Sequence, residues 1–212
     1  MFQFNIFIYY NLNIVKKIFT IFLFSIILSC AKNFDKSNIM EVSPPPTAKI
    51  EGKHAIFISK ENFNQINQIK SENCESWALK LNFEKPIKKS IENLVNKMFK
   101  DFEIVYQKLE KEKIEEDGFV SQISFYDLNG NSKFKTVRNT GMYQISLDIK
   151  IEVSNSSKSV INDISSSMNW EKNIFLNCNL QNGAVKSGQK ALENLIERIY
   201  ETTYESILQL KR

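Results

Sequence analysis

The most regular pattern of hydrophobic and polar positions lies in the second half of the chain. From residue 143 to residue 153, apolar and polar side chains alternate without interruption. The apolar positions are Tyr143, Ile145, Leu147, Ile149, Ile151 and Val153. Because successive side chains of a strand point to opposite faces, this period of two predicts a long strand with one buried face and one wet face.

Two other segments show the period of a helix. Pro86 is expected in the first turn of one helix, where its missing N–H is tolerated. The apolar stripe of this helix consists of Ile87, Ile91, Leu94, Val95, Met98 and Phe99. A second helix is predicted over 184–210. Its inner face carries Leu192, Leu195, Ile196, Ile199, Thr203, Ile207 and Leu210.

Shorter apolar runs predict the remaining strands. These runs cover residues 54–59, 102–109, 119–128 and about 164–176. Asn129-Gly130 lies between two strand-like runs and predicts a hairpin turn, and residues 155–159 predict another turn. We expect residues 60–84 to be irregular and residues 111–118 to form a charged turn.

The predicted order of elements is β-α-β-β-β-β-α, within a single domain of residues 54–212. Each predicted element has one apolar side, and such elements bury those sides in packed layers. The sequence therefore predicts an α+β fold in which an antiparallel sheet of four to five strands carries both helices on one face. The opposite face would present Lys, Glu, Gln and Ser side chains to solvent or to a partner.

The N-terminal pattern differs, because it contains one continuous apolar run. Ile18 to Cys30 is shorter than the roughly 20 residues that a spanning helix needs, and Lys16 and Lys17 precede it. A positive flank, a short apolar run and a small residue are typical of a secretory signal peptide. Residues 1–13 are apolar and uncharged, which favours a true start near the end of that stretch. The alternative is a single membrane span from Phe2 to Leu28.

Residues Ile27-Leu28-Ser29-Cys30 resemble the lipobox of bacterial lipoproteins. The resemblance implies a signal peptide over 1–29, cleavage after Ser29 and lipidation of the Cys30 thiol. Several acyl chains on one residue give stable membrane anchoring. The next residue is Ala31 rather than Asp, which resembles an outer-membrane address. The resemblance therefore predicts a lipid-anchored protein of the outer membrane that faces the periplasm.

Residues 30–53 lack apolar periodicity and contain Pro44-Pro45-Pro46. Proline runs favour extended polyproline II structure. We expect this segment to be a lipidated tether that holds the folded domain away from the membrane. The alternative, a disordered tail, differs little from it.

Two further cysteines, Cys74 and Cys178, form an even pair after Cys30. An exported chain meets an oxidising compartment, so the pair is expected to form a disulfide. Closing a loop of about 100 residues would stabilise the fold by roughly 4–5 kcal/mol in the chain-entropy model. The alternative is two separate buried thiols. No Cys-x-x-Cys motif indicates redox chemistry.

Charge and motifs exclude several classes of function. The formal net charge is only +4, and no basic patch interleaves with aromatic residues, so nucleic-acid binding has no electrostatic basis. His54 is the only histidine, and we expect it to begin a strand without a catalytic role. Glu115-Glu116-Asp117 lacks calcium-site spacing and is expected to be a solvated turn. No phosphate loop, nucleophile elbow or zinc spacing is present. The sequence therefore predicts no catalytic residues, metal or cofactor.

The lipobox and the element order over about 55–212 together resemble several envelope lipoproteins. These are the lipopolysaccharide-assembly lipoprotein LptE, the YajG-like lipoproteins and the peptidoglycan-synthase-activating lipoproteins. The resemblance implies a non-catalytic accessory or scaffold of a cell-envelope assembly, with an envelope protein as its partner. One alternative is a lipoprotein that contacts peptidoglycan or its synthases, for which the tether supplies reach. Another is an enzyme with unrecognised carboxylates.

Overall fold

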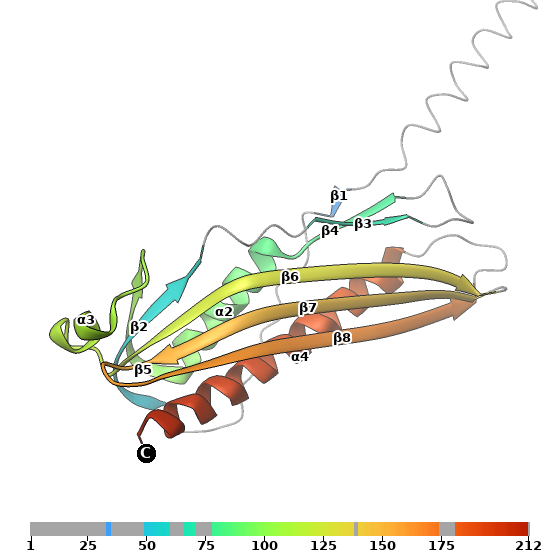
Figure 1. The fold of residues 1–212 in the computed structure, drawn as a ribbon. Coiled ribbons are helices and arrows are strands. Elements are labelled where there is room, and N and C mark those ends of the chain that lie inside the picture. Colours follow the sequence, from blue (N-terminus) through green and yellow to red (C-terminus); the bar gives the residue numbers. More distant parts are fainter. Residues whose placement is uncertain are drawn as a thin grey trace, which may run out of the picture.

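In the part of the chain that the structure describes, two β-sheets lie beside two long helices (Figure 1). The structure, a computed structural model, describes residues 33–34, 49–59, 66–70, 78–137, 140–173 and 181–211. The main sheet has five strands in the order β5-β2-β6-β7-β8. Their bounds are Ile50–Ile58 for β2, Phe99–Val105 for β5, Ser121–Val137 for β6, Thr140–Ser154 for β7 and Ser159–Asn173 for β8.

The main sheet is mixed, so the predicted antiparallel sheet is wrong. Strand β2 is parallel to both of its neighbours, β5 and β6, whereas β6, β7 and β8 are antiparallel to one another. The chain passes from β2 to β5 through helix α2 (Glu84–Met98), and such a crossover returns a strand in the same direction. The α+β class and the predicted number of strands in the main sheet are confirmed. The strand directions differ from the prediction, because a crossover connection makes β2 and β5 parallel.

The predicted hairpin turn at Asn129-Gly130 is also wrong, because β6 continues through it. Asn129 pairs with Asp148 and Gly130 with Leu147, and the ladder extends to the pair of Val137 with Thr140. The pairing shifts between Tyr126 and Asn129, where Asp127 has a φ of 53°. A bulge therefore interrupts β6 where a reversal of the chain was expected.

Two segments predicted to lack regular structure contain it. Strands β3 (Ile66–Lys70) and β4 (Ala78–Asn82) fall within residues 60–84 and form a second sheet with β1 (Asn33–Phe34), in the order β1-β4-β3. Helix α3 (Lys111–Glu116) replaces the predicted charged turn, and Ile114 is its only buried residue. One buried side chain in six positions gives no helical period. The predicted element order is therefore incomplete.

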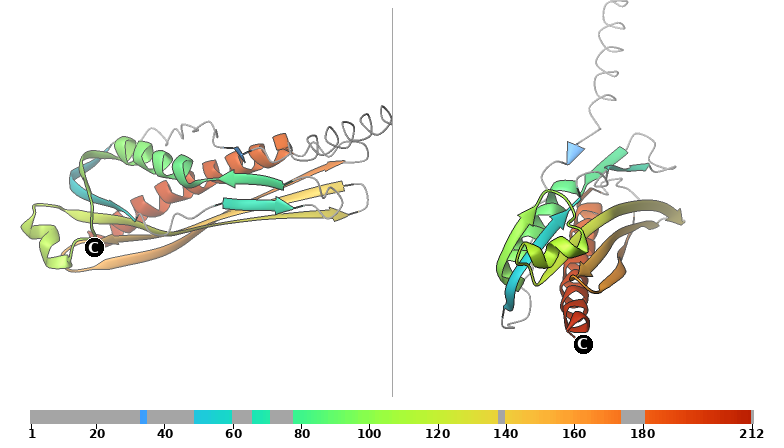
Figure 2. Two further views of the ribbon diagram at one scale, coloured as in Figure 1. Left: turned by 90° about the horizontal axis from the view of Figure 1, so that it is seen from above. Right: turned by 60° about the vertical axis from the view of Figure 1, so that its left-hand side comes forward.

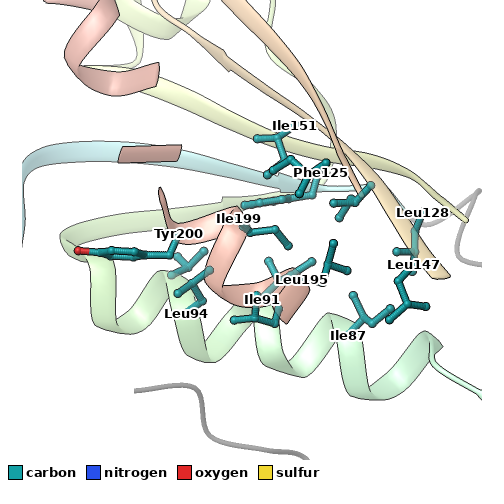
Figure 3. Close-up of a cluster of buried hydrophobic side chains, with 14 of the residues drawn as sticks. Ile87, Ile91, Leu94, Phe125, Leu128, Leu147, Ile151, Leu195, Ile199 and Tyr200 are labelled. Atoms are coloured by element: carbon teal, nitrogen blue, oxygen red, sulfur yellow. The ribbon is translucent and has the colours of Figure 1, made fainter. Parts of the chain in front are cut away.

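The long helices match their predicted segments within a few residues. Helix α2 begins at Glu84 and helix α4 spans Gln181–Leu210. Helix α4 contacts β7, β8 and α2, and Figure 2 shows it running along the long strands with α2 beside it. Side chains from both helices and from the strands point toward one another in one hydrophobic core (Figure 3). The predicted apolar stripes are buried: Ile87, Ile91, Leu195 and Ile199 have no exposed surface.

Two glycines of α4 let aromatic rings approach the helix closely. A Cβ atom on Gly188 would lie 2.8 Å from Cζ of Phe83. A Cβ atom on Gly183 would overlap the Trp170 ring. Real Cβ atoms do not approach other atoms this closely, so both positions require glycine, which has no Cβ atom. These two glycines therefore let the N-terminal half of α4 pack closely against its neighbours.

Strand β2 begins at Ile50, so four residues assigned to the tether belong to the folded domain. Strand β8 begins at Ser159, earlier than predicted, because the turn before it is short. The predicted turn is present but ends one residue earlier, at Lys158. The Asn155 side chain accepts hydrogen bonds from the backbone N–H groups of Ser157 and Lys158 at 2.9 and 2.7 Å. An Asx turn therefore connects β7 to β8.

Candidate functional site

The residues predicted to carry chemistry through their thiols lie outside the described residues. These are the lipidation site Cys30 and the disulfide candidates Cys74 and Cys178. The lipobox at 27–30 lies outside them as well. Lipidation, cleavage and the disulfide therefore stay predictions. The candidate sites that the structure describes lie in the folded domain.

His54 is a buried residue of β2. Its Nδ1 lies 2.9 Å from Oγ of Ser121, and its Nε2 lies 3.2 Å from the Glu51 carbonyl oxygen. Its ring packs on Phe99 with centroids 4.6 Å apart. Burial lowers the pKa of His54, because the charged imidazolium loses its hydration. Both ring nitrogens have partners, and this geometry describes a packing residue.

No group of three or more potential metal ligands occurs among the described residues. Within the same part of the chain, no helix combines the length and apolar character needed to cross a membrane.

The sheet face opposite α4 is polar, and we call it the polar face. It is built from alternate residues of β6, β7 and β8, which the registers place side by side. Its exposed members include Asn129, Asn131, Gln144, Ser165, Ser167 and Asn169. Strand β7 shows the division most clearly. Tyr143 and Ile145 are buried, while Gln144 between them is exposed.

At one end of the polar face, Glu152 is buried among polar partners. One carboxylate oxygen, Oε2, accepts hydrogen bonds from Nζ of Lys108 at 2.6 Å and from the Tyr126 hydroxyl at 3.1 Å. The other, Oε1, accepts one from the Ser159 hydroxyl at 2.9 Å. Three donors from three segments therefore satisfy this carboxylate.

These contacts fix the protonation of the cluster. Burial raises the pKa of Glu152, but the hydrogen bonds from Lys108, Ser159 and Tyr126 outweigh it and leave that pKa below its ordinary value. Burial and the neighbouring Glu152 carboxylate raise the pKa of Tyr126 to about 12. At neutral pH the carboxylate is therefore charged and the phenol is protonated. A stable ion pair of this kind holds segments together and does not exchange protons near neutral pH.

The loop that supplies Lys108 also covers this end of the polar face. Ile114 and Phe119 pack on Ala55 in a small second core. The Gln122 side chain accepts a hydrogen bond from the Leu109 N–H at 2.7 Å. The Lys108–Glu152 pair therefore belongs to the attachment of this loop, and the rest of the polar face is open.

A second exposed feature is the outer edge of β8. Strand β8 is the last strand of the main sheet, and no described strand pairs with its outer side. The guanidinium of Arg198 in α4 donates a hydrogen bond to the Ser165 carbonyl at this edge. Between β8 and α4 lies an open cavity of about 330 Å³. Its lining residues are Ser166, Ser167, Asn194, Glu197, Arg198 and Glu201.

Sequence reasoning placed Glu152 on the outward face of its strand but missed its partners. Lys108 lies 44 residues away in the chain, and Tyr126 lies 26 residues away. Nothing in the local pattern of either segment indicates that they meet. The edge of β8 was missed because a strand pattern does not tell which strand is outermost.

Neither a protein-family model nor a curated protein matches this chain. Solved structures of similar shape exist. One is a Xanthomonas campestris protein assigned to DUF330, at TM-score 0.47 and 7% identity over 85% of this chain and 97% of that one. Another is a putative neuraminyllactose-binding hemagglutinin homolog from Helicobacter pylori, at TM-score 0.44 and 9% identity over 84% of this chain and 97% of that one.

A third similar structure is described as a minor lipoprotein from Acinetobacter baumannii. It has a TM-score of 0.41 and 4% identity, over 73% of this chain and 91% of that one. The identities are too low to transfer any residue role, and the scores do not establish a family. The resemblance to LptE-like and YajG-like lipoproteins therefore stays a prediction.

Proposed function

We propose that this protein is a lipid-anchored lipoprotein of the bacterial outer membrane, and that it serves a cell-envelope assembly by binding rather than by catalysis. The observation that carries the proposal is Cys30 directly after Ile27-Leu28-Ser29, at the end of an apolar run that Lys16 and Lys17 precede. A thiol at this position has a chemical reason, since it can form a thioether to a diacylglyceryl group. The lack of Asp at position 31 supports the outer-membrane address.

The open part of the polar face supports a binding role. It presents hydroxyl and amide side chains over three long strands, together with charged residues such as Lys150 and Asp163. A surface of this composition can form many directed hydrogen bonds with a protein or with a polysaccharide. The buried polar cluster nearby is a satisfied ion pair, which agrees with a structural use of its charges.

Lipidation can be tested by metabolic labelling with an alkyne-bearing palmitate in a bacterium that expresses the full chain. The wild-type chain is expected to incorporate the label, and Cys30→Ala is expected to lose it. Cys178→Ala is the matched control, because it removes another cysteine and should leave the label in place. Mass spectrometry of the mature protein should show a chain that begins at Cys30. A labelled Cys30→Ala chain would contradict the proposal.

Location can be tested by density-gradient fractionation of the same cells. We expect the wild-type chain in the outer-membrane fraction and Cys30→Ala in the soluble envelope fraction. Substitution of Ala31 by Asp should move the protein to the inner membrane in an enteric host. If wild type and Cys30→Ala fractionate alike, the lipid anchor is absent and the proposal fails.

A second candidate, contact with peptidoglycan or its synthases, is favoured by the proline-containing segment before β2. Deletion of residues 36–48 would shorten the reach and leave β2 intact, since β2 begins at Ile50. Crosslinking in cells to a partner in the same membrane should survive this deletion. Crosslinking to a target across the periplasm should be lost, and that result would favour the second candidate.

The predicted Cys74–Cys178 disulfide belongs to the same proposal, because it requires export. Thiol alkylation of the unfolded mature protein, with and without prior reduction, measures it by mass. A mass difference of two alkyl groups that appears only after reduction is expected. Equal alkylation in both samples would mean two free thiols.

A further inference from the structure

We infer that the outer edge of β8 is a docking site for an extended basic peptide, which adds to the main sheet as a further strand. The inference deepens the proposed binding function by naming its surface and the chemistry of its partner, and it rests on that function only for its biological setting. The argument uses the backbone of β8, the side chains along its edge and the neighbouring face of α4.

The hydrogen-bonding pattern of β8 shows which of its residues direct their backbone N–H and C=O groups away from β7. At the turn, the Asn155 N–H donates to the Lys158 carbonyl at 2.9 Å, which closes the β7–β8 ladder. Residues of an antiparallel ladder alternate between bonding to the neighbour strand and pointing away from it. From this closing pair, the odd-numbered residues of β8 point away from β7. The hydrogen bond from Arg198 to the Ser165 carbonyl agrees with that phase.

The edge has few of the devices that normally block such pairing. Natural edge strands carry prolines, bulges or inward-pointing charges, or they are short. Strand β8 has 15 residues, and its pairing with β7 runs without a register shift. It contains no proline. Arg198 covers one outward carbonyl, so among the described contacts a single side chain occupies the edge.

The shape beside the edge suits an added strand. Ser165 and Ser167 are small and exposed, so they leave room for side chains of a strand laid next to them. The cavity between β8 and α4 continues from this position, and Ser166 at its floor is buried. The Ser166 hydroxyl donates to the Ala191 carbonyl at 2.8 Å and fixes the wall of the cavity. Alternate side chains of an added strand would enter it.

Charge selects the occupant. The charged residues of β8 whose backbone groups point away from β7 are Asp163, which lies 4.0 Å from Nζ of Lys150, and Glu171. Glu197 and Glu201 line the cavity on the α4 side, and Arg198 is the one cation there. Four carboxylates therefore stand against two cations, Lys150 and Arg198, so the charge beside the edge is predominantly negative. A lysine- or arginine-bearing peptide is attracted, whereas a second copy of this chain would bring the same carboxylates against their like.

The test is binding of defined peptides to the full chain in detergent micelles, followed by fluorescence anisotropy. The basic probe alternates lysine and threonine over about eight residues, a length typical of strands. The acidic probe has glutamate in place of lysine. A third probe is the basic peptide with every second backbone nitrogen methylated on the edge that would pair. We expect the basic probe to bind, the methylated probe to bind at least about tenfold more weakly, and the acidic probe not to bind.

Variants of the protein locate the site. Ser167→Pro removes an outward N–H without touching the ladder to β7, a position that edge strands tolerate. It should weaken the basic probe at least about tenfold. Ser167→Thr is the matched control, because it keeps the N–H, and it should bind as wild type does. Glu197→Gln combined with Glu201→Gln should weaken the basic probe about threefold or more, with a flatter salt dependence.

Several outcomes would overturn the inference. Equal binding of the methylated and unmethylated basic probes would mean charge attraction without strand addition. No binding of the basic probe would remove the site, and this holds even if Ser167→Pro fails to fold, because the probes are compared on wild type. Self-association that Ser167→Pro abolishes would make a second copy the occupant. None of these results depends on acylation, so a failure here is distinct from a failure of the Cys30 labelling experiment.

Discussion

The two faces of strand β7 have opposite roles although alternate residues of one continuous segment form them. On the face toward α4, Ile145, Leu147 and Ile151 are fully buried in the hydrophobic core. On the other face, Gln144 is exposed and Lys150 contacts charged neighbours. The difference shows that fold stability is concentrated on one face. The polar face contributes little to the core, except where Glu152 is buried.

The comparison predicts its largest effect for a truncation in the core. Leu147→Ala removes a side chain with no exposed surface and should lower the free energy of unfolding by about 2–5 kcal/mol. Gln144→Ala on the same strand should change it by less than about 0.5 kcal/mol. Urea denaturation of the two variants measures the contrast. Similar losses for both would mean that the faces are not energetically distinct.

A smaller effect is expected at Glu152, the place where the polar face is buried. Glu152→Gln removes the charge that Lys108 contacts at 2.6 Å, and it should lower the free energy of unfolding by about 1–2 kcal/mol. Asp163→Asn is the control, since its ion pair with Lys150 is 4.0 Å long and exposed. It should have almost no effect.

The same carboxylate gives a pH dependence with a definite sign. The pKa of Glu152 is lower in the folded protein than its ordinary value of 4.5. Its contribution to stability is therefore complete above that value and is lost as the pH falls through the folded pKa. Urea denaturation between neutral and acidic pH should show a steeper loss for wild type than for Glu152→Gln. Parallel curves would mean that the ion pair does not stabilise the fold.

A change of about 1 kcal/mol in the free energy of unfolding is expected from a substitution in α4, on the helix-covered side of the sheet. Gly188→Ala improves helix propensity by about 1 kcal/mol, but its Cβ atom would lie 2.8 Å from the buried Phe83 ring. Overpacking costs about 1–3 kcal/mol, so we expect a net loss. The double variant Gly188→Ala with Phe83→Leu should recover part of it. A more stable single variant would show that this interface has room.

The smallest effect is expected from His54, and it also depends on pH. Burial lowers the pKa of His54 below its ordinary value of 6.5, so the unfolded chain binds a proton more readily than the folded one. Stability should therefore fall as the pH drops below about 6.5, by at most about 1.4 kcal/mol per pH unit. His54→Gln should remove this slope. Thermal melting at pH 7 and pH 5.5 is the measurement, and an unchanged slope would contradict the role of His54.

Much of the helix-covered face could be predicted from local patterns. The apolar positions of residues 143–153 and of the two long helices are the residues that the structure buries. A period of two or of 3.6 is written into the chain locally, because each element must turn one side to the core. The bulge at Asp127 was not predictable in this way. An Asn-Gly pair favours a turn, but the long ladder with β7 overrides that local preference.

The amino-acid sequence by itself determined the α+β class and the buried face of each long element, and it is the basis of the export and lipid anchor that we propose. Each of these depends on residues close together in the chain. Only the tertiary structure decided that β2 lies parallel between β5 and β6, that Lys108 meets Glu152, and that β8 forms the edge of the sheet. These features join segments that are distant in the chain, and the free energy that selects among such pairings comes from packing the whole domain at once.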